Sequence, residues 1–440
     1  MTISRSTRSV AIWGFGREGQ AALAWMRARY PTCPVTILND SPLVDAPDGV
    51  AALTGDTASS ALSEGRFEVV IKSPGVSLYR PEIAAARKKG TRFTSGVNLW
   101  FRDNPGASTI AVTGTKGKST TARLLNHMLT KAGLDVALIG NVGVAALGQK
   151  PGRDVTVLEL SSYQIADLYA APNIALVTNL YVDHTPWHGS IEQYHRDKLR
   201  LIGNPMTIAV LNANSERLVE RAGARTNSIW YGRSDAYHVA DGRLMRGDRE
   251  VDASTLPLRG AHNLENLAAA CTVCDLAGVT SVRERVDLTG FAQLRHRLEE
   301  FHGRSGRLCV NDSISTVPEA TLVALGAYSD RKIALFLGGA DRGQDHSALL
   351  DHLSAAANIA CVILLPDTGA RIAKEIEGRS FAFPIVPAAS LAEGVEKAFS
   401  TSANDTVLLL SPAAPSFGHF RDFEERGDMF IAACGGSSTA

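Results

Sequence analysis

The feature that most constrains this chain is a glycine-rich loop at residues 113–121, which reads Thr-Gly-Thr-Lys-Gly-Lys-Ser-Thr-Thr. It follows directly on the apolar run 108–112 and precedes a helical pattern over 122–131. A buried strand that leads into such a loop and then into a helix holds nucleotide phosphates, because glycine N–H groups and the positive end of the helix dipole face the anion. Lys118 adds a cation, and Ser119 or Thr120 adds a hydroxyl for Mg²⁺. The loop therefore predicts a protein that uses a nucleoside triphosphate, and an enzyme.

The loop departs from the common phosphate-binding consensus, whose first glycine would fall on Val112. It fits the shortened form Gly-Thr-x-Gly-Lys-Ser/Thr-Thr, which few families carry. The alternative, a Gly-Lys turn without function, does not explain why a strand precedes the loop and a helix follows it.

Composition and charge exclude several classes of protein. The 440 residues include 45 Lys plus Arg and 45 Asp plus Glu, so nothing favours binding to nucleic acid or to an anionic membrane. No apolar stretch is long enough to span a bilayer, so we expect no membrane insertion, and we expect no signal peptide. The cysteines are scattered, and Cys271-x-x-Cys274 lies in an Ala-rich helical pattern that favours core packing over a redox pair or half a zinc site. These features predict a cytoplasmic protein.

The alternation of apolar strands and helical segments predicts an α/β fold of three consecutive domains. We expect a Rossmann-like domain at 1–105, a P-loop ATPase-like domain at 106–293 with a largely parallel sheet, and a Rossmann-like domain at 294–440. In the first, a strand at 10–13 runs into Gly14-x-Gly16-x-x-Gly19, and a second strand ends at Asp40. Taken alone, this pattern predicts a bound dinucleotide.

Polar residues follow the strands predicted around the loop. Glu159 ends a buried strand, and because parallel strand ends converge we expect it to bind Mg²⁺; the alternative is a helix-capping carboxylate. His184 follows the next strand and is either a ligand of a second metal or a structural histidine. Lys198 is unremarkable by spacing alone. Asn263 and Asn266 lie one helical turn apart, where amides can read an adenine edge or hold a loop.

Eight motifs together make the chain resemble the Mur ligases, ATP-dependent enzymes that add amino acids to a UDP-N-acetylmuramoyl precursor of peptidoglycan. In order they are Thr-Gly-Thr-Lys-Gly-Lys-Ser-Thr, Gly140-Asn141-Val142-Gly143, Glu159-Leu160-Ser161-Ser162, Asp183-His184, Lys198-Leu199-Arg200, His262-Asn263-Leu264-Glu265-Asn266, His296-Arg297 and Asn311-Asp312-Ser313. The segments 410–416 and 423–427 resemble the MurD branch, which adds glutamate to UDP-N-acetylmuramoyl-L-alanine.

The resemblance implies roles for individual residues. The substrate carboxylate would become an acyl phosphate that the amino acid then attacks. The implied ATP contacts are Gly114, Thr115, Lys116, Gly117, Lys118, Ser119, Thr120, Asn266, Arg297 and Asp312. The implied catalytic residues are Lys118, Glu159, His184, Lys198 and Asn141. Ser119 and Glu159 would hold one Mg²⁺, and His184 with a carbamylated Lys198 would hold a second.

The resemblance also reassigns the first domain, whose glycine turn would hold the UDP of the substrate rather than NAD. The implied UDP contacts are Gly14, Phe15, Gly16, Arg17, Asp40, Ser73, Pro74 and Gly75, and the implied amino-acid contacts are Thr316, Arg342, Ser416 and Phe423. Ile314 and Val317 stand where enzymes that add D-glutamate carry lysine and asparagine. With the stretch 94–100, they resemble a sister group that adds L-glutamate and relies on a separate epimerase. We therefore favour L-glutamate over D-glutamate, and expect a monomer.

Three other functions compete. A nicotinamide-dependent oxidoreductase would leave Lys118, Glu159 and His184 unexplained. A folylpolyglutamate synthase-like ligase shares the ATP loop but lacks the domain that residues 1–105 predict here. A binding protein without catalysis does not account for the set of Lys118, Glu159, His184 and Lys198.

Overall fold

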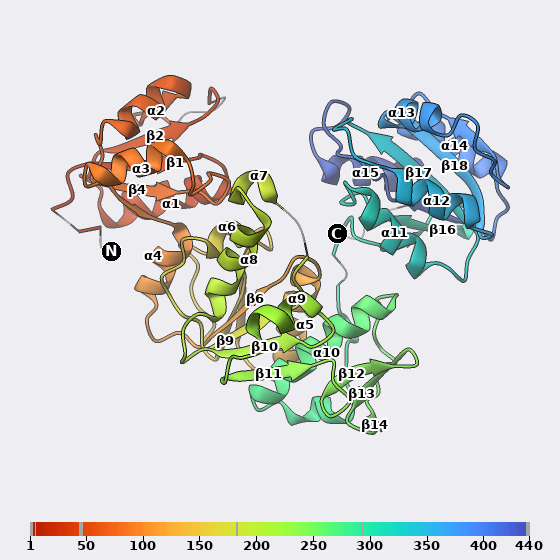
Figure 1. Cartoon of the computed structure of the whole chain (residues 1–440), viewed down its shortest axis with the longest axis horizontal. Coiled ribbons are helices and arrows are strands. Elements are labelled where there is room, and N and C mark those ends of the chain that lie inside the picture. The colour runs from red at the N-terminus through yellow and green to blue at the C-terminus, as the bar shows by residue number, and fades with distance from the viewer. Residues whose placement is uncertain (1–2, 5, 44–46, 182–183, 293, 437–440) are drawn as a thin grey trace. The chain divides into compact units, whose positions relative to one another are not determined.

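The computed structural model describes residues 3–4, 6–43, 47–181, 184–292 and 294–436. They form two compact units (Figure 1), one of residues 1–256 with 262–289 and the other of residues 257–261 with 290–440. Parallel sheets with helices packed on them dominate both units, which confirms the predicted α/β class. The three domain boundaries given above remain predictions.

The first sheet of the first unit has five parallel strands in the order β3-β2-β1-β4-β5. The strands are β1 Val10–Trp13, β2 Val35–Asn39, β3 Ala51–Thr54, β4 Val69–Lys72 and β5 Arg92–Thr94. The helices are α1 Arg17–Arg29, α2 Gly55–Ser63, α3 Pro81–Lys88 and α4 Gly96–Asp103. Alternate residues of β1 enter two different apolar clusters, since a strand covered on both faces buries every side chain. The strand order reverses between β1 and β4, which is where ligands bind in such sheets.

The second sheet of this unit has six parallel strands in the order β11-β10-β9-β6-β8-β7. The strands are β6 Thr109–Thr113, β7 Val136–Gly140, β8 Val155–Glu159, β9 Ile174–Val177, β10 Ile208–Asn212 and β11 Ser228–Tyr231. The α-helices are α5 Lys118–Lys131, α6 Ser162–Ile165, α7 Thr185–His188, α8 Ile191–Leu199, α9 Glu216–Ala222 and α10 Ala261–Leu276, with the short 3₁₀ turns η1 Arg200–Ile202 and η2 Thr280–Arg283. Because β6 lies between β8 and β9, the loop that follows β6 is flanked by the ends of both neighbours. Cys271 and Cys274 are fully buried in α10, as expected for core packing.

A small antiparallel sheet was not expected from the sequence. It consists of β12 Tyr237–Ala240, β13 Arg243–Arg246 and β14 Arg249–Glu250. All three strands are short, and β13 and β14 are rich in charged residues, so the sheet lacks the apolar runs on which strand prediction depends.

The second unit is a six-stranded sheet in the order β15-β16-β20-β17-β18-β19. The strands are β15 Glu299–His302, β16 Leu308–Asn311, β17 Ile333–Gly339, β18 Ile359–Asp367, β19 Ile385–Pro387 and β20 Val407–Leu410. The helices are η3 Arg304–Gly306, α11 Pro318–Ala327, α12 Ser347–Ala355, α13 Thr368–Glu375, α14 Leu391–Thr401 and α15 Phe423–Ala433. All neighbours are parallel except the edge strand β15, which pairs antiparallel with β16. Residues of β17 alternate between two apolar clusters, so both faces of this sheet are covered as well.

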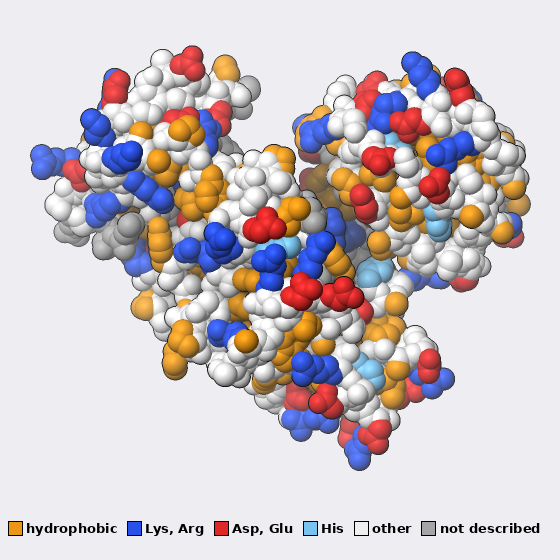
Figure 2. Space-filling model, viewed as in Figure 1, with side chains coloured by type: hydrophobic (Ala, Val, Ile, Leu, Met, Phe, Trp, Pro, Cys, Tyr) orange, Lys and Arg blue, Asp and Glu red, His pale blue; other side chains and the backbone are white. Residues whose placement is uncertain are grey.

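The surface bears charges of both signs. On the face shown in Figure 2, Lys and Arg side chains alternate with Asp and Glu side chains, in keeping with the zero net charge. Among the helices described, none combines the length and apolar character needed to cross a membrane.

Candidate active site

Two glycines shape the loop after β6. Gly114 has φ +150° and Gly117 has φ +80°, conformations that side chains disfavour. A Cβ at Gly114 would lie 1.8 Å from Thr178 Oγ1, and one at Gly117 would lie 2.4 Å from Asn266 Oδ1. The backbone here packs so closely that only glycine fits. Helix α5 begins at Lys118 without a side-chain cap, so the N–H groups of its first turn remain available to an anion.

The end of β9 holds the loop in this shape. Asn179 accepts hydrogen bonds from the backbone N–H of Thr115 at 3.1 Å and of Lys116 at 2.8 Å. Thr178 Oγ1 donates to the carbonyl oxygen of Lys116 at 2.6 Å. Sequence reasoning gave Thr178 and Asn179 no role, although two polar residues directly after a buried strand were a usable signal.

Both lysines among the predicted catalytic residues contact this loop. Lys118 Nζ donates to the carbonyl oxygen of Thr115 at 3.0 Å. Lys198 on α8 is only 1% exposed, and its Nζ donates to the carbonyl oxygen of Gly114 at 2.9 Å. Burying an ammonium group requires such polar partners. Lys198 is therefore a buried hydrogen-bond partner of the loop rather than one of the solvated lysines that helices usually carry.

Glu159 lies at the end of β8 and is completely buried. Its Oε1 accepts a hydrogen bond from Asn141 Nδ2 at 2.8 Å, whereas Oε2 has no hydrogen-bond partner among the described residues. Ser161, not Glu159, caps helix α6, so the helix-capping interpretation of this carboxylate is wrong. Buried carboxylate oxygens are normally satisfied, and one left open fits a hard cation such as Mg²⁺.

The other predicted metal ligands are Ser119 and His184. Ser119 is half-buried in the first turn of α5. His184 is exposed, adopts φ +52° and lies with Nδ1 2.9 Å from the hydroxyl of Tyr163. Asp183 of the same motif lies outside the described residues. Within the described part of the chain, no cluster of three or more His, Cys, Asp or Glu side chains forms a metal site by itself.

Asn266 supports the loop from α10. Its Oδ1 accepts a hydrogen bond from Thr121 Oγ1 at 3.2 Å, and its Nδ2 donates to Asn263 Oδ1 at 3.2 Å. The two amides thus contact each other and the helix that follows the loop, as expected if they hold the loop. The contact between Asn266 and ATP stays a prediction.

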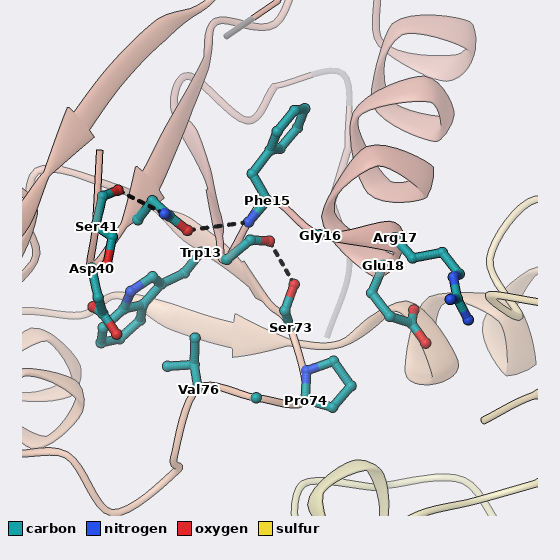
Figure 3. Close-up of a pocket in the computed structure, with 13 residues that line it drawn as sticks. Trp13, Phe15, Gly16, Arg17, Glu18, Asp40, Ser41, Ser73, Pro74 and Val76 are labelled. Carbon is teal, nitrogen blue, oxygen red and sulfur yellow. Dashed lines mark hydrogen bonds between the residues drawn. The ribbon is translucent and has the colours of Figure 1, made fainter. Parts of the chain in front are cut away.

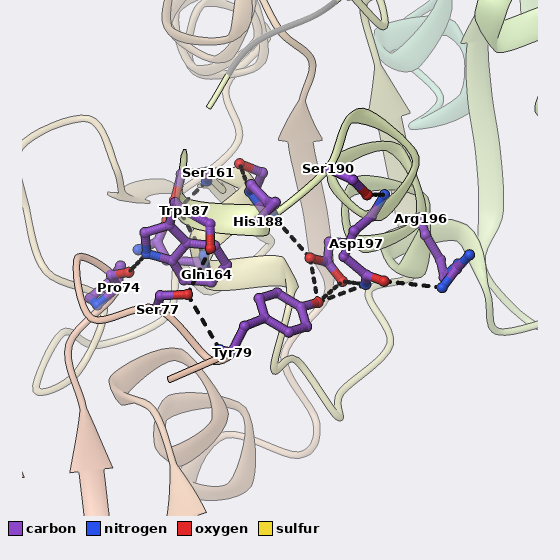
Figure 4. A network of polar contacts seen from close by, with 12 residues as sticks. Pro74, Ser77, Tyr79, Ser161, Gln164, Trp187, His188, Ser190, Arg196 and Asp197 are labelled. Carbon is purple, nitrogen blue, oxygen red and sulfur yellow. Dashed lines mark hydrogen bonds and ion pairs between the residues drawn. The ribbon is translucent and has the colours of Figure 1, made fainter. Parts of the chain in front are cut away.

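A polar network joins the two sheets of the first unit (Figure 4). The Asp197 carboxylate accepts hydrogen bonds from His188 Nδ1 at 2.7 Å and from the Tyr79 hydroxyl at 2.7 and 2.8 Å. His188 Nε2 lies 3.0 Å from Ser162 Oγ. Nearby, Trp187 Nε1 donates to the Pro74 carbonyl oxygen at 3.1 Å. Sequence reasoning missed Tyr79, His188 and Asp197, because no motif connects residues so far apart.

A pocket of about 450 Å³ opens at the ends of β1 and β4 (Figure 3). It is lined by all eight predicted UDP contacts and by five residues that were not predicted, Trp13, Glu18, Asn39, Ser41 and Val76. Gly14 has φ +86°, and a Cβ at Gly19 would lie 2.2 Å from the Gly14 carbonyl oxygen, so α1 starts tightly against the turn. Ser73 Oγ closes the turn by donating to the same carbonyl oxygen at 2.6 Å.

Charged groups line this pocket. Asp40 pairs with Arg80 at 2.7 Å, and the Arg80 guanidinium lies 4.6 Å above the Trp13 ring. Glu18 accepts a hydrogen bond from Gln164 Nε2 at 3.1 Å, and burial raises the pKa of its carboxyl. At the end of β4, directly before the lining residue Ser73, Lys72 forms a buried ion pair with Asp167 at 3.3 Å and donates to the Val76 carbonyl oxygen at 3.0 Å.

In the second unit, Asp312 is buried just after β16. Its carboxylate accepts hydrogen bonds from Ser411 Oγ at 2.8 Å, Ser315 Oγ at 2.5 Å and the Leu298 N–H at 3.2 Å. Burial nevertheless raises the pKa of Asp312 to about 6. The positive charge of Arg297 acts in the opposite direction and lowers this pKa. The Nε atom of Arg297 is buried without a hydrogen-bond partner in the described chain.

The four predicted amino-acid contacts also lie in the second unit. Ser416 is 2% exposed, Thr316 is half-buried, and its carbonyl oxygen accepts a hydrogen bond from Gln344 Nε2 at 2.8 Å. The Phe423 ring meets His296 edge-on at 6.0 Å. Arg342 is exposed and lies 5.5 Å from the centre of the Phe417 ring. Gln344, which links two of these segments, was not predicted.

The chain is similar to known proteins of one family. Residues 112–274 match the family model described as the Mur ligase middle domain. The chain is 39% identical to the UDP-N-acetylmuramoyl-L-alanine–L-glutamate ligase of Salinispora tropica over 97% of each chain. It is 38% identical to the protein of the same name from Xanthomonas euvesicatoria, over 97% of this chain and 95% of the relative.

Solved structures share the fold. UDP-N-acetylmuramate-alanine ligase MurC from Thermotoga maritima superposes with a TM-score of 0.59 at 18% identity, covering 97% of this chain and 98% of that one. MurF ligase from the same organism, in complex with ADP, gives 0.56 at 16% identity, covering 98% and 96%. A phosphate loop in a parallel sheet, in a chain with these relatives, defines an ATP-dependent ligase that forms amide bonds. The chain belongs to the Mur ligase family.

Proposed function

We propose that this enzyme joins glutamate, with the L-enantiomer favoured, to UDP-N-acetylmuramoyl-L-alanine as a step in peptidoglycan precursor synthesis. The observation that carries the proposal is the meeting of Lys118 and Lys198 on the carbonyl oxygens of one phosphate loop. The names of the relatives supply the substrates. Because ATP and a UDP-linked sugar are the substrates, we expect the reaction to take place in the cytoplasm.

The reaction brings anions together. The alanine carboxylate attacks the γ-phosphate of ATP and forms an acyl phosphate, with ADP as the leaving group. The glutamate amine then attacks the acyl carbon, loses a proton and displaces phosphate. Lys118 and Arg297 would neutralise the phosphoryl oxygens, and Asn141 would contact the substrate near the reacting carbonyl.

The residues at the loop fit magnesium, because Glu159 leaves one buried oxygen open. Ser119 and Glu159 would hold one ion, and His184 with Lys198 a second; bound Mg²⁺ supplies positive charge beside the phosphates. For this role the Lys198 ammonium group would lose a proton, and the resulting amine would add CO₂ and release a second proton, which turns a cation into an anionic oxygen ligand. Asn266, Arg297 and Asp312 are the proposed contacts to the rest of ATP.

The first-unit pocket is the proposed site of the UDP group. Its turn lies at the start of α1, where a pyrophosphate is stabilised by N–H groups and the helix dipole. Arg17 adds a positive charge on the same wall.

Phosphate release with ATP, Mg²⁺ and UDP-N-acetylmuramoyl-L-alanine, measured in parallel with L-glutamate and D-glutamate, tests the proposal. We expect release with L-glutamate, since Ile314 and Val317 replace the residues typical of D-glutamate enzymes, and then expect a separate epimerase to act on the product. Release with D-glutamate alone would support the alternative, the usual MurD reaction. Release with neither would contradict glutamate as the substrate.

A further inference from the structure

Arg426 on α15 is a fully buried guanidinium in the second unit. It donates from Nε to Ser313 Oγ at 3.0 Å, from Nη2 to the Ser313 carbonyl oxygen at 2.7 Å and from Nη1 to the Ala414 carbonyl oxygen at 3.0 Å. Among the residues that the structure describes, no carboxylate pairs with it. A buried charge without a counter-ion is costly, and such groups are commonly kept for function.

These bonds connect three of the four segments that carry the proposed amino-acid contacts, those of Thr316, Ser416 and Phe423. Ser313 begins the turn that leads to Thr316, and Ala414 begins the one that leads to Ser416. Arg426 itself lies one turn along α15 from Phe423. Ser313 Oγ closes the arrangement by donating to the Phe423 carbonyl oxygen at 2.8 Å.

The surrounding backbone is shaped to fit the guanidinium. A Cβ at Gly339 would lie 2.8 Å from Arg426 Nη1 and 2.3 Å from the Pro415 carbonyl oxygen. Ala413, next to the accepting residue, adopts φ +55°, which is strained for a residue with a side chain. Burial lowers the pKa of Arg426 to about 9, so the group still carries its charge near neutral pH.

We propose that Arg426 is a positioning residue that determines specificity for an acidic amino acid. It holds the three segments in place, and its uncompensated positive charge favours a substrate with a second carboxylate over a neutral one. The inference rests on the proposed function, and it assigns the selection of an acidic amino acid to one residue.

Arg307 provides a matched control at the opposite end of the same sheet. It is 2% exposed and precedes β16, whereas Ser313 follows it. Its guanidinium donates to the Thr406 carbonyl oxygen at 2.8 Å and to Ser402 Oγ at 2.5 Å, and burial lowers its pKa too. Its loss should affect stability as the loss of Arg426 does, but not the amino-acid site.

The experiment compares the full-length wild type with Arg426→Lys, Arg426→Met and Arg307→Met. Phosphate release is measured while glutamate, its neutral amide glutamine, ATP and the UDP-linked substrate are varied, and thermal unfolding is followed alongside. For Arg426→Met we expect the KM for glutamate to rise about 10- to 100-fold and the preference for glutamate over glutamine to shrink, with the other two KM values within about twofold. Arg426→Lys keeps the positive charge but loses the planar set of N–H donors of the guanidinium. We therefore expect it to retain most of the preference for glutamate over glutamine while its KM for glutamate rises.

Each outcome bears on the inference. If Arg426→Met does not fold, a raised KM for glutamate in Arg426→Lys supports it. An unchanged KM and unchanged preference in the folded Arg426 variants would overturn it, as would an equal rise in Arg307→Met. A wild type that turns over neither glutamate nor glutamine would overturn the proposed function together with the inference, whereas normal wild-type turnover of glutamate isolates the failure to Arg426.

Discussion

Tyr79 donates its hydroxyl hydrogen to the carboxylate of Asp197 at 2.7 Å and thereby links the first sheet to helix α8. Asp197 directly precedes Lys198, whose amine contacts the phosphate loop. Tyr79 lies just beyond the pocket segment 73–76, and Ser77 Oγ in between donates to the Trp187 carbonyl oxygen at 2.6 Å. Hydrogen bonds therefore connect the segment next to the proposed UDP site to helix α8 (Figure 4), and Lys198 on the same helix contacts the phosphate loop.

Tyr79→Phe removes this bond while keeping the ring. A hydrogen bond to a charged group contributes about 1.5–3 kcal/mol, so we expect kcat/KM for the UDP-linked substrate to fall about 10-fold or more. Steady-state phosphate release provides the measurement. Tyr169→Phe is the control, since that side chain is 57% exposed and its hydroxyl donates no hydrogen bond in the described structure. Equal effects of the two variants would contradict a specific role for Tyr79.

Lys118→Ala should abolish phosphate release. The variant loses the cation that lies over the loop, and groups that stabilise transferring phosphoryl charge account for about 10²- to 10⁵-fold in rate. Lys131→Ala, at the other end of α5 in a surface pair with Asp287 at 3.4 Å, should retain activity. Full turnover by Lys118→Ala would remove the catalytic assignment.

Lys198→Ala tests the carbamate. We expect strongly reduced activity that short carboxylates such as formate or acetate partly restore, because they can replace the missing anionic oxygen ligand. Incorporation of labelled CO₂ into the wild type, but not into the variant, gives a second readout independent of turnover. An unmodified Lys198 in the active wild type, with no rescue of the variant, would exclude carbamylation.

Asp312→Asn should change how stability depends on pH. Burial raises the pKa of Asp312 from 3.8 to about 6, so the folded state binds its proton more tightly than the unfolded state does. The free energy of unfolding that this group contributes is therefore highest below pH 4 and falls as pH rises to about 6, by up to about 3 kcal/mol. Denaturant unfolding at pH 4 and pH 7 should show the wild type losing stability relative to the variant at the higher pH. A constant difference between the two proteins would contradict the raised pKa.

Much of the fold could be predicted because its signals are local. The apolar runs of β1, β6 and β8 and the glycine turns after β1 and β6 place strands, loops and helices without knowledge of distant contacts. The edge strand β15 and the strands β13 and β14 escaped prediction because charged residues interrupt their apolar pattern, and β12 escaped it because it is only four residues long.

The site divides in the same way. The sequence alone determined the glycine turn after β1, the loop at 113–121 and the position of Glu159 at a strand end. These features depend on backbone conformations and strand ends that neighbouring residues specify. Only the tertiary structure decided that Lys198 reaches Gly114, 84 positions away, and that Tyr79 reaches Asp197, 118 positions away. It likewise decided that Arg426 is buried against Ser313. A lysine or arginine on a helix, or a tyrosine in a turn, has the same local pattern whether it faces water or the core, and the order in which strands pair determines which of these it meets.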